Sequence, residues 1–219
     1  MIIYLHLDNF FHQNYKFMLN TVFFVSGKGS NLKSCYEKFP KDKIRICAVV
    51  SNKKCGAVQF AVQNEIPVFL VSSENQTGFF NYEELIRQLK KIPAELIVLA
   101  GFLKLIPDNF VDEFESRIIN IHPALLPSFG GEGMYGMNVH KAVFDSSAKI
   151  SGATVHFVDK IYDHGKIIAQ KSVDISNVGG PEEIAERVLD IEHELLPFVI
   201  QKFAEKKIVI NHNRVLIAE

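Results

Sequence analysis

This 219-residue sequence has little excess charge of either sign, no closely spaced cysteine pair and few long apolar runs. Its 24 lysines and arginines balance 25 aspartates and glutamates, which leaves a formal net charge of −1. This balance gives no reason to expect nucleic acid or an anionic membrane as a partner. Cys35, Cys47 and Cys55 are odd in number and contain no CxxC pair, so neither a disulfide framework nor a zinc site is expected. We therefore expect a cytoplasmic protein.

The first residues also lack the features of a targeting or membrane segment. They have no basic start, no unbroken apolar region and no small-residue cleavage site, which a signal peptide would show. His6, Asp8 and His12 interrupt every apolar run, so a membrane span is not expected either. We interpret residues 1–19 as an N-terminal extension outside the core fold, with Met18 as an alternative start of translation. An additional ordered strand is the competing interpretation.

What the sequence does have is a regular alternation of two patterns from residue 21 to residue 122. Short apolar runs predict strands at residues 21–26, 44–51, 66–71, 95–101 and 117–122. Helical spacing lies between them, at residues 32–39, 56–65, 81–91 and 107–114. Buried strands separated by helices are typical of parallel pairing with both faces of the sheet covered. The sequence therefore predicts a doubly wound, mostly parallel α/β sheet.

The pattern changes after about residue 150. Residues 151–159 and 166–175 are longer segments joined by a short turn, and they predict an antiparallel hairpin. Residues 181–207 predict a long amphipathic helix, in which Pro181 suits the first turn and Pro197 should cause a kink or a break. Since no repeat or linker interrupts the chain, residues 20–219 are expected to form a single domain.

In an open α/β sheet, ligands bind at the carboxyl ends of the parallel strands. The turn SGKGSN, residues 26–31, follows the first predicted strand and precedes a helix. The backbone NH groups of Gly29, Ser30 and Asn31 could bind a phosphate monoester through free donors and the helix dipole. The turn matches neither the dinucleotide fingerprint nor a Walker loop. Glycines that serve only the geometry of the turn are an equally good explanation.

Asn120 and His122 end the fifth predicted strand, and two prolines follow them. Residues two apart in a strand face the same side, so both side chains can point at one ligand atom. An amide donor beside an imidazole suits acyl transfer, in which negative charge develops on a carbonyl oxygen. No serine or cysteine stands beside the pair. This favours direct attack by a substrate amine over an acyl-enzyme, although a distant nucleophile stays open. The alternative is that His122 caps the strand and Asn120 satisfies a turn, and that neither has a catalytic role.

The turn of the predicted hairpin supplies a carboxylate, Asp163. This carboxylate could approach His122, raise the pKa of the imidazole and fix its tautomer. Taken alone, Asp163 is an ordinary turn residue. We interpret His140, His156 and His193 as structural residues or indirect neighbours of the site.

Five segments are more specific together than any of them alone: SGKGSN, LAGFLKLIP, NIHPALLP, HFVDKIYDHG and IEHELLP. In order and spacing they resemble the folate-dependent formyltransferases, in the branch that acts on glycinamide ribonucleotide. The resemblance covers about residues 20–210. It implies a Rossmann-like formyltransferase fold. It also implies transfer of a formyl group from the co-substrate 10-formyltetrahydrofolate to the amine of glycinamide ribonucleotide, in purine biosynthesis and without a metal.

The resemblance further implies a role for individual residues. Asn120 would stabilise the oxyanion of the tetrahedral intermediate, His122 would hydrogen-bond that oxyanion and help to move the proton, and Asp163 would orient and charge His122. The implied substrate contacts are the NH groups of Gly29, Ser30 and Asn31 for the phosphate, and Glu192 for the ribose. The implied folate contacts are Leu103, Lys104, Leu105, Ile106, Val158 and Asp159.

The sequence departs from the family pattern at three positions. Ser128 replaces a usual lysine, Lys104 stands where an arginine is common, and His164 replaces a glycine. A formyltetrahydrofolate hydrolase or a methionyl-tRNA formyltransferase would usually carry a further domain, and a non-catalytic nucleotide-binding module would bind without turnover. These remain the alternatives. The expected partners are small-molecule substrates, with no nucleic acid and no membrane, and the chain is expected to be a monomer or a weak homodimer.

Overall fold

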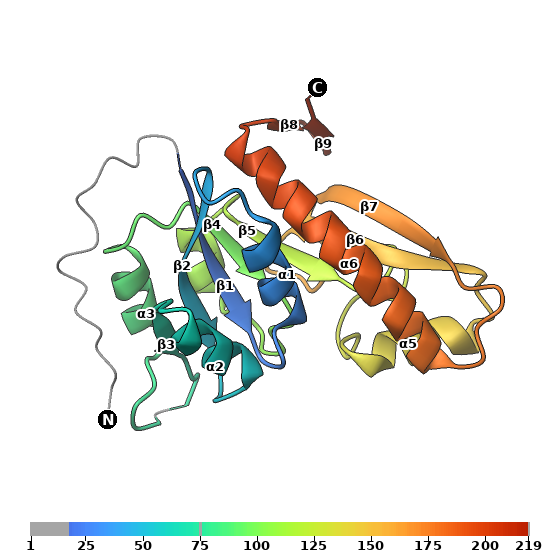
Figure 1. The fold of residues 1–219 in the computed structure, drawn as a ribbon, viewed down its shortest axis with the longest axis horizontal. Coiled ribbons are helices and arrows are strands. Elements are labelled where there is room, and N and C mark those ends of the chain that lie inside the picture. Colours follow the sequence, from blue (N-terminus) through green and yellow to red (C-terminus); the bar gives the residue numbers. More distant parts are fainter. Residues whose placement is uncertain (1–17, 75, 219) are drawn as a thin grey trace.

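A seven-stranded sheet runs through the molecule, with helices on both of its faces (Figure 1). The computed structural model describes residues 18–74 and 76–218. The strands lie in the order β3-β2-β1-β4-β5-β6-β7, with β1 to β5 parallel and the last two antiparallel. The strands are β1 (Leu19–Val25), β2 (Ile44–Ser51), β3 (Val68–Leu70), β4 (Leu96–Leu99), β5 (Ile118–His122), β6 (Ile150–Phe157) and β7 (Ile167–Asp174). The helices are α1 (Ser30–Lys38), α2 (Gly56–Gln63), α3 (Tyr82–Leu89), α4 (Asp108–Glu113), α5 (Met137–Asp145) and α6 (Pro181–Ala204).

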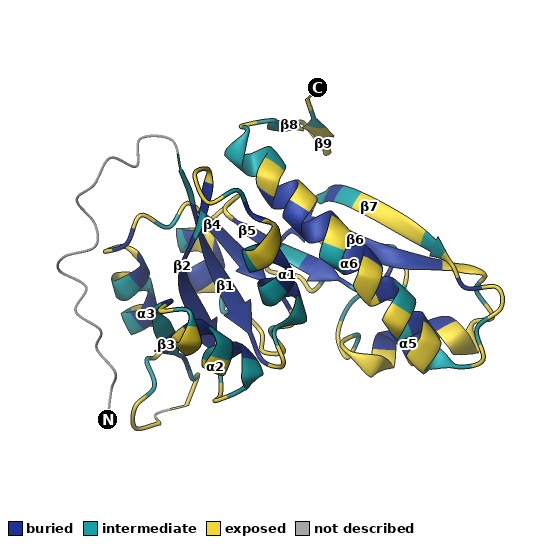
Figure 2. Ribbon diagram, viewed as in Figure 1, coloured by how far each residue is buried: buried dark blue, intermediate teal, exposed yellow. Residues whose placement is uncertain are grey.

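Two hydrophobic cores lie on opposite faces of the sheet, because successive side chains of a strand point to opposite sides. In β1, Phe23 and Val25 belong to the core beneath α1, α2, α5 and α6. Val22 and Phe24 belong to the core beneath α3 and α4. Figure 2 shows the central strands buried and the helices exposed on their outer sides. The predicted doubly wound arrangement is therefore confirmed.

The antiparallel hairpin was also predicted correctly. β6 pairs with β7 from Ile150 opposite Asp174 onward, and it pairs with β5 on its other edge. The hairpin thus extends the parallel sheet instead of forming a separate layer (Figure 1). β3 is shorter than the predicted strand at residues 66–71.

The long helix α6 continues through Pro197, so the proline does not break it. Proline has no amide hydrogen, and the carbonyl of His193, four residues earlier, therefore has no helical donor. Two side chains of α1 donate to this carbonyl instead, Ser34 Oγ at 3.1 Å and Lys38 Nζ at 2.8 Å. The contact with α1 satisfies the polar group that the proline leaves, which explains why the helix persists.

A C-terminal hairpin of β8 (Ile208–Asn211) and β9 (Arg214–Ile217) is present that was not predicted. The alternating IVINHNRVLI pattern could have predicted it. Residues 1–17 lie outside the described chain, so the extension over residues 1–19 stays a prediction, although β1 already begins at Leu19. Within the described ranges, no helix has the length and apolar character needed to cross a membrane.

Candidate active site

β5 is the strand at which the parallel part of the sheet meets the antiparallel hairpin. Asn120, on this strand, pairs with Leu99 of β4 on one side and with His156 of β6 on the other. His122 follows two residues later and is buried. The strand therefore presents an amide and an imidazole on the same side at its carboxyl end, as the spacing predicted.

Asp163 reaches this pair from the turn of the β6–β7 hairpin. Its Oδ2 lies 3.5 Å from Nδ1 of His122, and its Oδ1 lies 3.6 Å from Nε2 of His156. The backbone NH of Gly131 donates to Oδ2 at 2.9 Å. Both carboxylate–imidazole distances are longer than an ordinary hydrogen bond, so the carboxylate acts on the two rings mainly through its charge. Asn120, His122 and Asp163 thus lie together around one small region.

His156 is a member of this cluster that sequence reasoning treated as structural or indirect. Its Nδ1 donates to the carbonyl of Phe157 at 2.7 Å, because a carbonyl oxygen only accepts. Its Nε2 is then an acceptor, and Nδ2 of Asn120 donates to it at 3.1 Å. This contact fixes the orientation of the Asn120 amide and uses one of its two hydrogens. The signal for it is the β5–β6 register, which local sequence does not reveal.

Burial decides the protonation of His122. Removal from water lowers the pKa of the imidazole, and this effect outweighs the Asp163 carboxylate and the Phe129 carbonyl, which both raise it. Asp163 does raise the pKa of His122, as expected, but burial is the larger effect and leaves the net pKa below its ordinary value. Nε2 of His122 donates to the carbonyl of Phe129 at 2.9 Å, so Nδ1 is the nitrogen that faces Asp163.

Asp163 is ionised beside this neutral ring. Burial opposes its charge, but His156, His122 and the NH of Gly131 lower the pKa of the carboxyl group, the two imidazoles doing so when they carry a proton. A neutral imidazole next to a carboxylate can accept a proton and hold it, because the resulting imidazolium gains a close opposite charge. The cluster is therefore suited to a reaction that releases a proton.

The anchor turn, residues 129–131, holds both of these groups. The carbonyl of Phe129 accepts from His122, and the NH of Gly131 donates to Asp163. Phe129 and Asp163 both adopt left-handed backbone conformations, with φ of 56° and 53°. A Cβ on Gly130 would lie 3.0 Å from Cβ of Asp163, so the turn packs tightly against the hairpin. The position of the imidazole and that of the carboxylate are thus set by one short segment.

The residues predicted to bind the phosphate and the ribose also lie close to one another. Gly29 has φ of 72° and precedes α1, whose first turn has no side-chain cap. Nδ2 of Asn31 donates to Oε2 of Glu192 on α6 at 2.7 Å, and Oδ1 of Asn31 is buried with no partner in the described part of the chain. Burial raises the pKa of Glu192 to about 7, although the bond from Asn31 lowers it. Backbone NH groups, an unsatisfied amide oxygen and a poised carboxyl group therefore lie at the start of α1.

The predicted folate contacts fall into two segments joined by packing. Ser26 Oγ, at the end of β1, accepts from the NH of Leu103 at 3.0 Å and so fixes the segment of residues 103–106. Within it Leu103, Lys104 and Leu105 are exposed, whereas Ile106 is buried. Ile106 shares a hydrophobic core with Val158 of the hairpin, and Asp159 follows, with Oδ2 2.8 Å from Nδ1 of His164.

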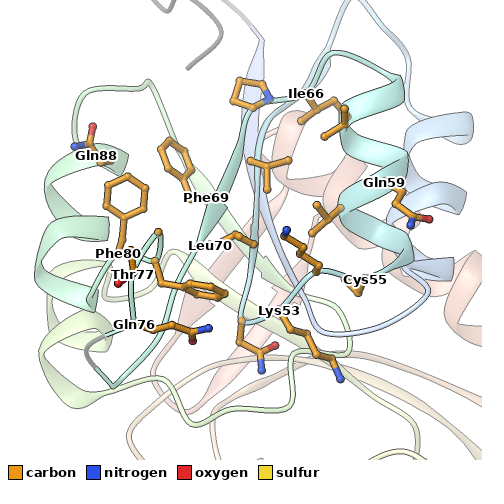
Figure 3. A pocket seen from close by; sticks show the side chains of 18 of the residues that line it. Lys53, Cys55, Gln59, Ile66, Phe69, Leu70, Gln76, Thr77, Phe80 and Gln88 are labelled. Carbon is orange, nitrogen blue, oxygen red and sulfur yellow. The ribbon is translucent and has the colours of Figure 1, made fainter. Parts of the chain in front are cut away.

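A groove of about 1140 Å³ lies elsewhere, beside the edge strand β3 (Figure 3). Side chains from α2, β3 and α3 surround it, among them Gln59, Phe69 and Gln88. None of the predicted site residues is among the described residues that line it. The groove and the cluster of predicted catalytic residues therefore lie in different parts of the molecule. We place the candidate site at Asn120 and His122, because His122 and Asp163, both with shifted pKa values, lie together there.

Several known proteins are similar to the chain over most of its length. The sequence model described as "Formyl transferase" matches residues 19–200. The chloroplastic phosphoribosylglycinamide formyltransferase of Vigna unguiculata is 44% identical over 190 residues, which are 85% of this chain and 61% of that protein. The chain spans 61–65% of the length of three such chloroplastic relatives. The phosphoribosylglycinamide formyltransferase of Bacillus subtilis is 35% identical over 82% of this chain and 91% of its own.

Solved structures give the same result for the fold. The crystal structure of phosphoribosylglycinamide formyltransferase from Anaplasma phagocytophilum has a TM-score of 0.83 and 31% identity, and the match covers 92% of this chain and 95% of that one. Glycinamide ribonucleotide transformylase 1 from Symbiobacterium toebii has a TM-score of 0.80 and 29% identity, over 97% of this chain and 99% of that one.

Proposed function

The chain belongs to the formyl transferase family, and from this premise we propose that it transfers a formyl group from 10-formyltetrahydrofolate to the amine of glycinamide ribonucleotide. One observation carries the proposal: Asn120, His122 and Asp163 lie together at the carboxyl end of β5. Relatives that match over most of this chain are named phosphoribosylglycinamide formyltransferases.

Three side chains, those of Asn120, His122 and Asp163, take part in the proposed reaction. The amine nitrogen attacks the formyl carbon, and the electron pair of the carbonyl moves onto its oxygen. Asn120 donates its second amide hydrogen to that oxyanion. His122 can donate to it only once Nδ1 is protonated, because the Nε2 hydrogen is bound to the Phe129 carbonyl. The nitrogen loses a proton, which His122 takes up and Asp163 stabilises. When the tetrahedral intermediate collapses, the bond to N10 of the folate breaks, N10 receives a proton, and the formyl group stays on the ribonucleotide.

The two substrates are assigned to the two ends of the site. The NH groups of Gly29, Ser30 and Asn31 hold the phosphate, and Glu192 accepts hydrogen bonds from the ribose. The segment of residues 103–106, with Val158 and Asp159, contacts the folate. No step of this scheme uses a metal ion.

Three broader expectations accompany this function. Residues 20–219 form a single domain, the partners are small molecules, and the chain is a monomer or a weak homodimer. The cytoplasmic setting stays a prediction, because three relatives are named as chloroplastic proteins.

A formyl-transfer assay with 10-formyl-5,8-dideazafolate and glycinamide ribonucleotide tests the proposal. We expect turnover that requires the ribonucleotide and that falls by about 10²- to 10⁴-fold in His122→Ala, the range for losing an acid–base or oxyanion group. His212→Ala, an exposed histidine in the turn between β8 and β9, is the matched control and should be unaffected. Deformylation of the folate without the ribonucleotide would indicate a hydrolase. Binding without turnover would indicate a nucleotide-binding module.

A further inference from the structure

The carbonyl of His193 in α6 has no donor within the helix and accepts hydrogen bonds from another helix instead. In a regular helix it would accept from the NH of residue 197, which is a proline. Ser34 Oγ and Lys38 Nζ, both from α1, donate to it at 3.1 Å and 2.8 Å. A carbonyl oxygen has two lone pairs, so the two donors satisfy it completely.

The donors form a stripe along one face of α1. Asn31, Ser34 and Lys38 are three and then four residues apart, which places them on the side of the helix that faces α6. Asn31 donates to Glu192, and the other two donate to the next residue along, His193. Asn31 and Ser34 are each 7% exposed, so their two contacts are largely sheltered from water, whereas the Lys38 contact is exposed. Two successive residues of α6 therefore accept from three polar side chains of α1.

The start of α1 is closely packed. Gly29, which precedes the helix, makes no side-chain cap, and a Cβ there would lie 2.6 Å from Cβ of Ala57, so the helix end is closely fitted against α2. A small rotation of α1 would move the NH groups of Ser30 and Asn31 and change the Asn31–Glu192 contact. The contacts that fix the rotation of α1 therefore also fix the groups proposed to bind the phosphate and the ribose, which are the NH groups of Ser30 and Asn31 and the side chain of Glu192.

We propose that Pro197 is a positioning residue for the ribonucleotide. By withholding an amide hydrogen from the His193 carbonyl, it reserves that oxygen for Ser34 and Lys38, and the resulting contact sets α1 against Glu192. The inference rests on the proposed function for the identity of the ligand. The acceptor is the backbone carbonyl of His193, which is available because Pro197 has no amide hydrogen. It lies 159 residues from Ser34 in sequence.

Pro197→Ala tests this directly, because alanine restores the amide donor within α6 and draws the carbonyl back toward the helix axis. We expect the KM for glycinamide ribonucleotide to rise about three- to tenfold, the change expected for losing about one hydrogen bond. The KM for the folate and kcat should stay within about twofold. The Tm should be unchanged or higher, because alanine is the better helix former. A purely structural role for the proline would instead move stability and all kinetic constants in the same direction.

Variants of α1 provide the controls. Ser34→Ala and Lys38→Met should each raise the same KM, and neither should add fully to Pro197→Ala, since all three act on one carbonyl. Lys41→Met is the matched control, because Lys41 also donates to a backbone carbonyl, that of Tyr36, but within its own segment. It should leave the KM unchanged. An unchanged KM in Pro197→Ala, or full additivity with Ser34→Ala, would overturn the inference.

Hydrogen exchange separates this inference from the proposed function. If the wild-type protein does not formylate the ribonucleotide, the proposed function fails, but the positioning of α1 can still be measured. Amides of residues 30–38 should exchange several-fold faster in Pro197→Ala than in the wild type, while those of α3 should not change. Equal exchange in both proteins would refute the role of Pro197 by itself.

Discussion

Glu192 should make the protein less stable as the pH rises. Its side chain is only 8% exposed, and burial raises the pKa of its carboxyl group from 4.5 to about 7 in the folded state. The folded protein therefore keeps a proton that the unfolded chain releases. Stability from this group is complete below about pH 4.5 and is lost as the pH rises through about 7.

The size of the effect follows from the shift. A rise from 4.5 to about 7, at about 1.4 kcal/mol per unit, corresponds to a loss of about 3 kcal/mol. Glu192→Gln removes the titration but keeps an oxygen that can accept from Asn31. We expect the variant to match the wild type at pH 4.5 and to be more stable by about 3 kcal/mol at pH 8.5, or by roughly 6–12 °C in Tm.

Urea unfolding at the two pH values measures this difference. Glu194→Gln is the matched control on the same helix, because Glu194 is exposed and pairs with Lys171. It should follow the wild-type pH dependence. If the wild type and Glu192→Gln lose the same stability between pH 4.5 and 8.5, the carboxyl group ionises in the folded state at little cost, and the burial argument is wrong.

Three further changes test other parts of the structure. Asp163→Asn should lower kcat by about 10²- to 10⁴-fold in the formyl-transfer assay, because the imidazolium loses its opposite charge; near-normal turnover would contradict its role. His156→Leu should lower kcat about tenfold and leave both KM values within about twofold, because the Asn120 amide loses the acceptor that orients it; equal changes in KM would indicate a general loss of structure. Gly152→Ala should abolish or severely reduce soluble folded protein, judged by circular dichroism, because its Cβ would overlap the carbonyl oxygen of Lys171 on β7.

The local sequence pattern was sufficient to predict the strands and helices whose apolar residues recur at regular spacing. The alternation of apolar strands and helices in the first half predicted the two-faced sheet, since that pattern directly reflects which side chains are buried. The spacing of Asn120 and His122 placed them on one side of a strand for the same reason. The meeting of Asp163 with His122 came from the family resemblance, because their separation of 41 residues carries no local signal.

What local pattern could not supply was the tertiary environment. His156 contacts Asn120 only because of the register of β5 with β6, and a shift of one residue would have turned it away. The pKa of His122 depends on how much protein covers it, which outweighed the carboxylate visible in the sequence. Pro197 was expected to interrupt its helix, and the donors that satisfy the freed carbonyl lie on α1. In each case the deciding partner belongs to another element.

The anchor turn has a consequence for how this scaffold can vary. The two groups it holds are bound by its backbone, through a carbonyl at residue 129 and an NH at residue 131, and not by its side chains. The glycine-rich loop that continues from it to α5 at Met137 begins only after these two attachments are made. A change in the backbone path of residues 129–131 would therefore move the imidazole and the carboxylate together, whereas the side chains of residues 132–136 bind neither group directly.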